Sequence, residues 1–473
     1  MSRMSANTSC PSWWCGIPAV FCILIGAAAM ALGDKGSPGD KGRPLSPGDF
    51  KHRSNLTEAE LLEQLRKETP EVDVRQEQGF TKSLVDAVAR ALKRSERPDQ
   101  DDRPARGDPT MTLSMLKRRA DLKGLPFIDG PGCQLRDLQA KQLQQVSLSI
   151  RDSVEHIFSK RDEPLTLRNR IEDEEGVVKA LNSAVRLYSK ARLPIFVQAF
   201  VPQGPKVRLR LVELLAGWRA EETSRLLAQR AIFDLSADVR AKAIEALKKR
   251  RRADYRDVLL KALRYPWAPA ADHATEALVA LDDRAALPEL VELLDLPDPR
   301  TPYRNKDKQW VVHELVRINH LRNCLLCHAA SASEADLARA FSPSVEKPLP
   351  PTGYYDGIGE FVRADITYLK QDFSVFHAAA HPDPWPKVQR FDYLVRLREL
   401  SDDERTKRGL KVSEEGQALA KTAEVKSFPQ RDAVLFALRE LHGRDAGTTS
   451  AAWRKELGKA PPEDRVRAPE GRR

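Results

Sequence analysis

Cysteine is scarce in this chain of 473 residues, which contains six. Three of them lie before residue 32, inside an apolar leader, and the other three are Cys133, Cys324 and Cys327. An odd number of three excludes the dense disulfide framework that stabilises many small secreted domains. Cys133, in the turn-like stretch DGPGCQL, is expected to be a lone thiol.

The sequence also lacks the common catalytic signatures. It has no phosphate-binding loop and no G-x-G-x-x-G motif after a strand-like segment. The stretch that begins at His313 and Glu314 has Arg317 where an H-E-x-x-H zinc protease has its second histidine. We therefore predict no catalytic residues, and a non-enzymatic role is favoured.

Long apolar runs are absent except near the N-terminus. Residues 13–32 carry no charge, and Ala29-Met30-Ala31 matches the small-residue pattern of a signal-peptide cleavage site. Residues 1–31 are therefore predicted to be a signal peptide, with the protein exported to the periplasm or another extracytoplasmic space. The alternative is an uncleaved N-terminal membrane anchor, because the run approaches the length of a membrane span.

The net charge is +10, and the lysines and arginines are scattered along the chain. The densest run, KKRRR at residues 248–252, is typical of the basic end of a helix, where cations meet the negative end of the helix dipole. No nucleic-acid partner is predicted.

Composition divides the chain into segments. Residues 32–54 contain four collagen-like triplets, too few for a triple helix, and are predicted to be a flexible linker. Residues 55–164 are predicted to be an N-terminal helical region that begins with a capping box of Thr57 and Glu60. Residues 459–473 are predicted to be a disordered tail.

The centre of the chain contains an internal repeat. Three segments that start at residues 204, 236 and 267 align so that Leu215, Leu247 and Leu278 coincide, at a period of about 31 to 32 residues. Each segment is followed by a second amphipathic stretch, and helix pairs that cannot bury their apolar faces alone stack into a solenoid. The predicted fold class is therefore all-α, an α-solenoid of short helix pairs.

The repeat resembles the short HEAT repeats of bacterial proteins, through the D-V-R step that starts at Asp238 and the Ala-Leu ending of its helices. The resemblance covers residues 165–296, and residues 401–458 look like a further helical region of this type. It implies a surface that binds protein partners. Between these regions, residues 297–400 are rich in proline and aromatic residues, and are predicted to form an irregular insert that buries a bound group.

One pentapeptide in this insert, C-L-L-C-H from Cys324 to His328, indicates a specific chemistry. In c-type haem attachment, two thiols on one turn add to the vinyl groups of one porphyrin edge, and the adjacent histidine reaches the iron. The motif resembles that of c-type cytochromes, and N-C-L-L-C-H is similar to a segment of exported bacterial HEAT-repeat proteins. The resemblance implies Cys324 and Cys327 as the thioether sites of one haem c, and His328 as its proximal axial ligand.

The sixth iron ligand is left open by the sequence. No methionine follows the motif, so either His377 or His381 is predicted as the distal ligand, or the iron has an open face. His313 and His320 are expected to be structural residues on a helix that leads into the motif.

Three other interpretations of the motif stay open. The two cysteines could form a disulfide or a redox-active thiol pair. They could bind zinc together with His377 and His381, which are four residues apart, although Pro382 would end any helix there. The motif could also be a relic that carries no haem.

The predicted function is that of an exported HEAT-repeat protein with one covalent c-type haem, for electron transfer with a redox partner or for haem-based sensing. The alternative function, from a different class, is a non-enzymatic protein-interaction scaffold. In that case the cysteine pair would be a structural disulfide or a zinc staple.

Overall fold

The computed structural model describes residues 56–72, 113–114, 116–119, 122–127, 175–182, 193, 196–197, 199–331, 339–342, 360–382, 387–410 and 427–458. The predicted leader, linker and tail, together with Cys133, lie outside the described residues. Of the described part of the chain, 52% is helix and 17% is strand, and the strands form two sheets. The predicted all-α solenoid is therefore wrong, and the protein has a mixed α/β fold.

The first described helix, α1 (Glu58–Glu68), begins at the predicted capping box. The backbone N–H of Glu60 donates to the Thr57 hydroxyl at 3.3 Å, and the Thr57 N–H donates to the Glu60 carboxylate at 2.7 Å. Two otherwise unpaired backbone donors are thereby satisfied, which fixes where the helix starts. Strand β1 (Glu71–Val72) follows directly.

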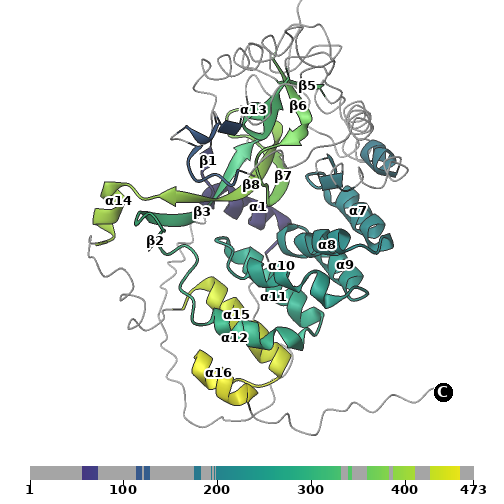
Figure 1. Ribbon diagram of the computed structural model, residues 1–473. Coiled ribbons are helices and arrows are strands. Elements are labelled where there is room, and N and C mark those ends of the chain that lie inside the picture. Colours follow the sequence, from purple (N-terminus) through teal and green to yellow (C-terminus); the bar gives the residue numbers. More distant parts are fainter. Residues whose placement is uncertain are drawn as a thin grey trace, which may run out of the picture. The chain divides into compact units, whose positions relative to one another are not determined.

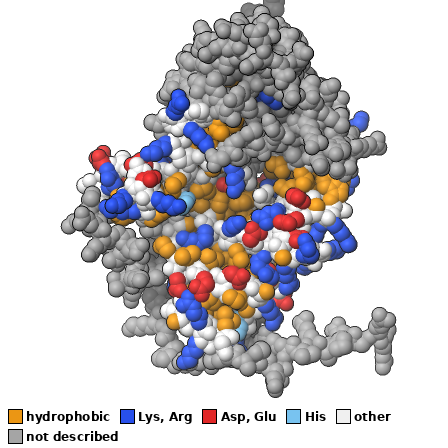
Figure 2. Space-filling view, viewed as in Figure 1, with side chains coloured by type: hydrophobic (Ala, Val, Ile, Leu, Met, Phe, Trp, Pro, Cys, Tyr) orange, Lys and Arg blue, Asp and Glu red, His pale blue; other side chains and the backbone are white. Residues whose placement is uncertain are grey.

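The central helices follow one another in pairs along the chain. They are α7 (Pro205–Gly217) with α8 (Glu221–Phe233), α9 (Ala237–Leu247) with α10 (Arg256–Ala262), and α11 (Ala268–Ala280) with α12 (Leu287–Leu293), with short 3-10 turns η2 (Arg252–Asp254) and η3 (Arg284–Ala286). The three segments aligned by sequence are α7, α9 and α11, and their equivalent leucines Leu215, Leu247 and Leu278 are all buried. The face drawn in Figure 2 shows acidic and basic side chains interspersed over these helices.

A last helix pair extends this array from far along the chain. Helix α15 (Pro429–His442) packs on α11 and α12, and α16 (Ser450–Leu457) packs on α12 (Figure 1). Gly443 ends α15 in the left-handed conformation, with φ of 76°, as its position after the last periodic residue predicts. About 135 residues of sequence therefore separate two helices that are neighbours in the array.

Where the structure describes it, the predicted irregular insert is mostly strand. The strands of the larger sheet are β2 (Tyr303–Arg304), β3 (Trp310–Asn319), β7 (Phe373–Ala378) and β8 (Val388–Glu399), together with β1. Their order is β1-β3-β8-β7, with β2 also paired to β3; β1 runs parallel to β3 and the other pairs are antiparallel. Beyond β8, helix α14 (Asp402–Lys407) begins at the Ser401 capping box.

The residues of this region explain why it forms strands. Phe391, Tyr393 and Val395 alternate with Asp392 and Leu394, and aromatic and β-branched side chains suit a pleated surface buried on both sides. The same pattern overturns another prediction: His313 lies on strand β3, and His320 directly follows that strand, so neither is on a helix.

One face of the larger sheet packs on the helical array. The ring of Phe373 stacks on Tyr393 from β8, with ring centres 4.7 Å apart, on Phe233 from α8 at 5.1 Å, and on Trp267 at the start of α11 at 5.8 Å. Tyr265 adds a polar contact, donating its hydroxyl to Asp372 at 2.9 Å. This aromatic junction joins the sheet to the helices.

The opposite face packs under the C-x-x-C-H motif. Val316, Ile318 and Leu394 on this face form an apolar cluster with Leu326 and Cys327 of the motif. The motif itself is the one-turn helix α13 (Cys324–Cys327), and it leads into a second sheet, β4-β6-β5, made of β4 (His328–Ala330), β6 (Glu360–Thr367) and β5 (Arg339–Ser342). The two faces of the larger sheet therefore have separate cores.

Candidate functional site

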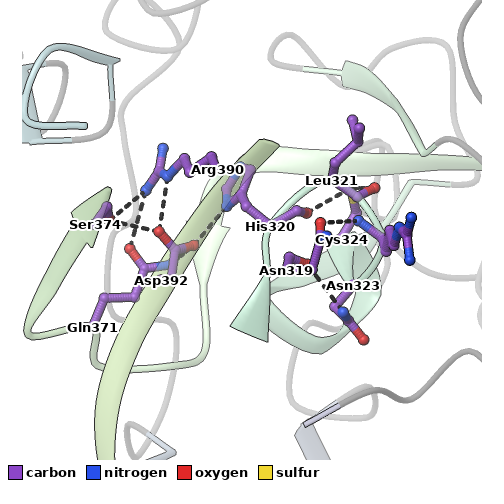
Figure 3. A network of polar contacts seen from close by, with 10 residues as sticks. Asn319, His320, Leu321, Asn323, Cys324, Gln371, Ser374, Arg390 and Asp392 are labelled. Carbon is purple, nitrogen blue, oxygen red and sulfur yellow. Dashed lines mark hydrogen bonds and ion pairs between the residues drawn. The ribbon is translucent and has the colours of Figure 1, made fainter. Parts of the chain in front are cut away.

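The turn that carries the two cysteines is built by backbone and amide contacts of its own sequence. The Leu326 N–H donates to the Asn323 carbonyl at 3.0 Å, and the Asn323 side chain donates to the Asn319 carbonyl at 3.0 Å (Figure 3). After the turn, the Tyr368 N–H donates to the Cys327 carbonyl at 2.7 Å. These bonds fix the turn between the end of β3 and strand β6.

A break in strand pairing lies at the histidine of the motif. His328 pairs with Thr367 of β6, but the next residue, Ala329, pairs with Arg363, so the register shifts between them. Such irregularities re-aim a side chain and recur beside functional sites. His328 is buried, at 7% exposed, and lies where the one-turn helix becomes a strand.

Both cysteines are free thiols, not bonded to each other. The Cys324 sulfur lies 3.6 Å from the backbone carbonyls of His320 and Leu321, and Cys327 is 1% exposed within its apolar cluster. Burial raises the pKa of the Cys324 thiol to about 11, and it raises the pKa of Cys327 further. Both thiols are therefore neutral at physiological pH, and neither matches the low-pKa cysteine of a redox enzyme.

A buried carboxylate, Asp392, is the centre of a polar network beside this turn (Figure 3). Its Oδ1 accepts from Arg390 Nε at 2.8 Å and from the Ser374 hydroxyl at 2.5 Å. Its Oδ2 accepts from Gln371 at 2.9 Å and lies 2.7 Å from His320 Nδ1. Four donors thus surround one carboxylate that is fully shielded from solvent.

These contacts determine the charge state of Asp392. Burial alone would raise its pKa, but the positive charge of Arg390, the contact with His320 and the Ser374 hydroxyl outweigh burial, so the pKa lies well below its usual range. An ionised carboxylate only accepts hydrogen bonds, so Nδ1 of His320 carries the shared proton. In the neutral imidazole, Nε2 is then the nitrogen with the free electron pair.

The two histidines nearest the cysteines also meet each other. The rings of His320 and His328 have centres 6.0 Å apart and are nearly perpendicular, at 88°. The backbone N–H of His320 donates to the Arg390 carbonyl at 2.9 Å, which holds this residue against β8. The motif turn therefore gathers two thiols and two imidazoles on the Asp392 side of the sheet.

The structure does not bring His377 to the motif. His377 lies on β7, and strand alternation places it with Phe391 and Tyr393 on the face toward the helices. Its ring stacks on Phe391, with ring centres 4.0 Å apart, and its Nε2 lies 3.1 Å from the Tyr393 hydroxyl. Burial lowers the pKa of His377 to about 4. The sheet itself separates this histidine from Cys327.

The other predicted histidines differ in position. His381 is exposed, and its backbone carbonyl accepts from Arg322 at 2.6 Å, two residues before Cys324. His313 stacks on Tyr303, with ring centres 5.5 Å apart, near the far end of β3. Within the described residues, no group of three or more His, Cys, Asp or Glu side chains is arranged to hold a metal ion, so the predicted zinc set of two cysteines with His377 and His381 is not assembled.

Sequence reasoning missed the Asp392 network altogether. The available signal was a pair of charged residues, Arg390 and Asp392, that alternate with the aromatic residues Phe391 and Tyr393. Buried charges in such a stretch must be paired. A strand over residues 388–399 places both charges on one face, and the structure shows that this face carries the motif.

Comparisons with known proteins add no identity: no protein-family model, curated protein or solved structure matches this chain. Among the described residues, no helix is both long and apolar enough to cross a membrane.

Proposed function

We propose that the protein carries one c-type haem, bound covalently through Cys324 and Cys327 with His328 as an axial ligand, and serves electron transfer or haem-based sensing. The observation that supports this proposal is that one turn brings both thiols and His328 together beside a second imidazole. The proposal includes export, because haem is attached to such motifs outside the cytoplasm.

The chemistry of the donor set fits this group. Cys324 and Cys327 would hold the group through two thioether bonds, each formed by adding S–H across one vinyl double bond, which would need no oxidant. This addition requires reduced cysteines, and both are free thiols. Leu326, Tyr368 and Leu369 around Cys327 supply the apolar surroundings that a largely apolar porphyrin requires. When bound, the haem would supply one-electron chemistry or a site for a small gaseous ligand.

The proposal is tested by measuring whether haem is covalently attached to the protein. The full chain, exported from cells with haem-attachment machinery, should retain haem after denaturation and acid–organic extraction. The double variant Cys324→Ser with Cys327→Ser should lose all covalent haem, whereas Cys133→Ser, which removes the third cysteine outside the leader, should keep it. Retention of covalent haem by the double variant, or no haem in the unmodified protein, would overturn the proposal.

A second candidate function has one observation in its favour. Cys327 is 1% exposed among tightly packed leucine, valine and tyrosine side chains, as a purely structural cysteine would be. In that case the protein is a binding scaffold, and the pair is a structural thiol or disulfide. The mass of the exported protein separates the two: a disulfide lowers it by two hydrogens, and haem raises it by the mass of the porphyrin.

A further inference from the structure

We propose that His320 is the second axial ligand of the haem iron, with its imidazole oriented by Asp392. This inference rests on the proposed function, since it names a ligand for the same cofactor. Of the described histidines, His320 is the one whose ring contacts His328.

The contact with Asp392 fixes the tautomer of His320. Nδ1 of His320 lies 2.7 Å from the buried carboxylate of Asp392, which leaves Nε2 as the ligand atom. No hydrogen bond of this Nε2 is found within the part of the chain that the structure describes. Histidines that bind metals almost always donate their other ring nitrogen to a carboxylate, a carbonyl or water, which sets the ring orientation and raises the basicity of the ligand.

The two imidazoles are also close together. Side chains that would hold one metal ion must be neighbours in the fold, because each metal–nitrogen bond is only about 2.0–2.1 Å long. The centres of the His320 and His328 rings lie 6.0 Å apart. The contact is edge-to-face, with the ring planes at 88° to each other, so the two imidazoles are direct neighbours in the fold.

Within the described residues, the other histidines of this region lie elsewhere. His377 lies on the other face of the sheet, bonded to Tyr393. His313 stacks on Tyr303 near the far end of β3. His381 is exposed, and only its backbone contacts Arg322. His320 is also held rigidly, because its own N–H is bonded to the Arg390 carbonyl and its ring to Asp392.

This ligand assignment explains why a buried polar network surrounds Asp392. A buried ion network contributes little net stability compared with an apolar core, so its presence needs another reason. Here Arg390, Ser374 and Gln371 hold the carboxylate in place through hydrogen bonds, and the carboxylate in turn fixes His320. Asp392 is thus a positioning residue and does not touch the iron.

The experiment compares absorption and electron paramagnetic resonance spectra of the haem-loaded full chain. The unmodified protein should be six-coordinate and low-spin, with two nitrogen ligands. His320→Ala should become high-spin, bind CO readily in the ferrous state, and return to low-spin on addition of free imidazole. The matched control His381→Ala should keep the unmodified spectrum. Asp392→Asn should stay low-spin but with a raised reduction potential, because the ligand loses its anionic partner.

The outcomes separate this inference from the proposed function. Covalent haem in a His320→Ala variant that stays low-spin without imidazole would overturn the ligand assignment and leave haem attachment intact. A methionine–iron charge-transfer band or a five-coordinate iron in the unmodified protein would do the same, and needs no variant to fold. Absence of any covalent haem would overturn both proposals together.

Discussion

The two faces of the larger sheet use one strand, β8, in opposite ways. Toward the helices, Phe391 and Tyr393 are buried among stacked rings. Toward the motif, Arg390 and Asp392 form a buried ion pair at 2.8 Å. Because side chains alternate along a strand, consecutive residues of β8 lie in different cores, one aromatic and one charged.

This difference separates stability from function. Stacked aromatic rings bury a large apolar area and stabilise both the sheet and its contact with the helices. A buried carboxylate has a desolvation penalty that its partners only offset. The aromatic face therefore explains why the sheet stays on the helical array, whereas the charged face is best explained by the side chain that it orients, His320.

The largest expected effect is on the aromatic face. Phe373→Ala should lower the free energy of unfolding by about 3–5 kcal/mol, because it removes a buried ring that contacts Tyr393, Phe233 and Trp267 and leaves a cavity. Denaturant unfolding measures this loss. The fraction of folded molecules with covalent haem should not change.

Phe376→Ala is the matched control for this substitution. Phe376 lies on the same strand but on the motif face, and it is only half-buried, so its truncation should be less destabilising. Equal losses for the two variants would show that the aromatic junction has no special role.

The next largest expected effect is a pH dependence of stability that comes from His377, which also lies on the aromatic face. Burial lowers the pKa of His377 to about 4, from an unfolded value near 6.5, so the unfolded chain binds the proton more readily. Above pH 6.5 the free energy of unfolding therefore does not depend on the titration of His377. As the pH falls from 6.5 toward 4, the free energy of unfolding decreases, by about 1.4 kcal/mol per pH unit at most. His377→Gln should flatten the unfolding free energy across this window.

His381→Gln provides the comparison for that pH profile. His381 is exposed, so its substitution should leave the slope between pH 6.5 and 4 unchanged. A slope that is insensitive to His377→Gln would mean that His377 is hydrated in solution and not buried against Phe391.

The sequence predicts the helical array better than the sheets. Local signals mark where these helices begin. They are the capping box at Thr57 for α1 and the spacing of apolar residues in the repeated segments. Strand pairing between β3 and β8 joins residues about eighty apart, such as Val316 and Leu394, and no local pattern specifies such a partner. The proline content of residues 297–400 also masked the short period-2 stretches that form the strands.

The candidate site was predictable only in part. The spacing of Cys324, Cys327 and His328 was visible because it is contiguous in sequence. His320 was predicted only as a structural residue, because its contact with Asp392 joins residues 72 apart in the chain and no local pattern indicates it. His377 looked equally suitable by sequence distance, and only the alternation of β7 shows that it lies on the other face.

The smallest effect tests the charged face directly. The Ser374 hydroxyl donates to Asp392 at 2.5 Å, and both residues are buried. Ser374→Ala should lower the free energy of unfolding by about 1.5–3 kcal/mol, the range for a hydrogen bond to a charged group. Ser450→Ala is the matched control: Ser450 donates to Asp295 at the same distance, but the Asp295 side chain is 50% exposed, so the loss should be about 0.5–1.5 kcal/mol.

Acid should erase the Ser374 effect, because the folded-state pKa of Asp392 is depressed. A carboxylate of this kind contributes stability above the unfolded pKa of about 3.9, and that contribution is lost as the pH falls through the folded value. The difference between the unmodified protein and Ser374→Ala, measured by urea unfolding, should therefore stay constant down to about pH 4, because the unfolded state is the same for both, and should shrink only as the pH falls further toward the depressed folded-state pKa of Asp392. A difference that persists unchanged at low pH would show that Ser374 acts through packing, and that the charged face differs less from the aromatic face than the hydrogen bonds indicate.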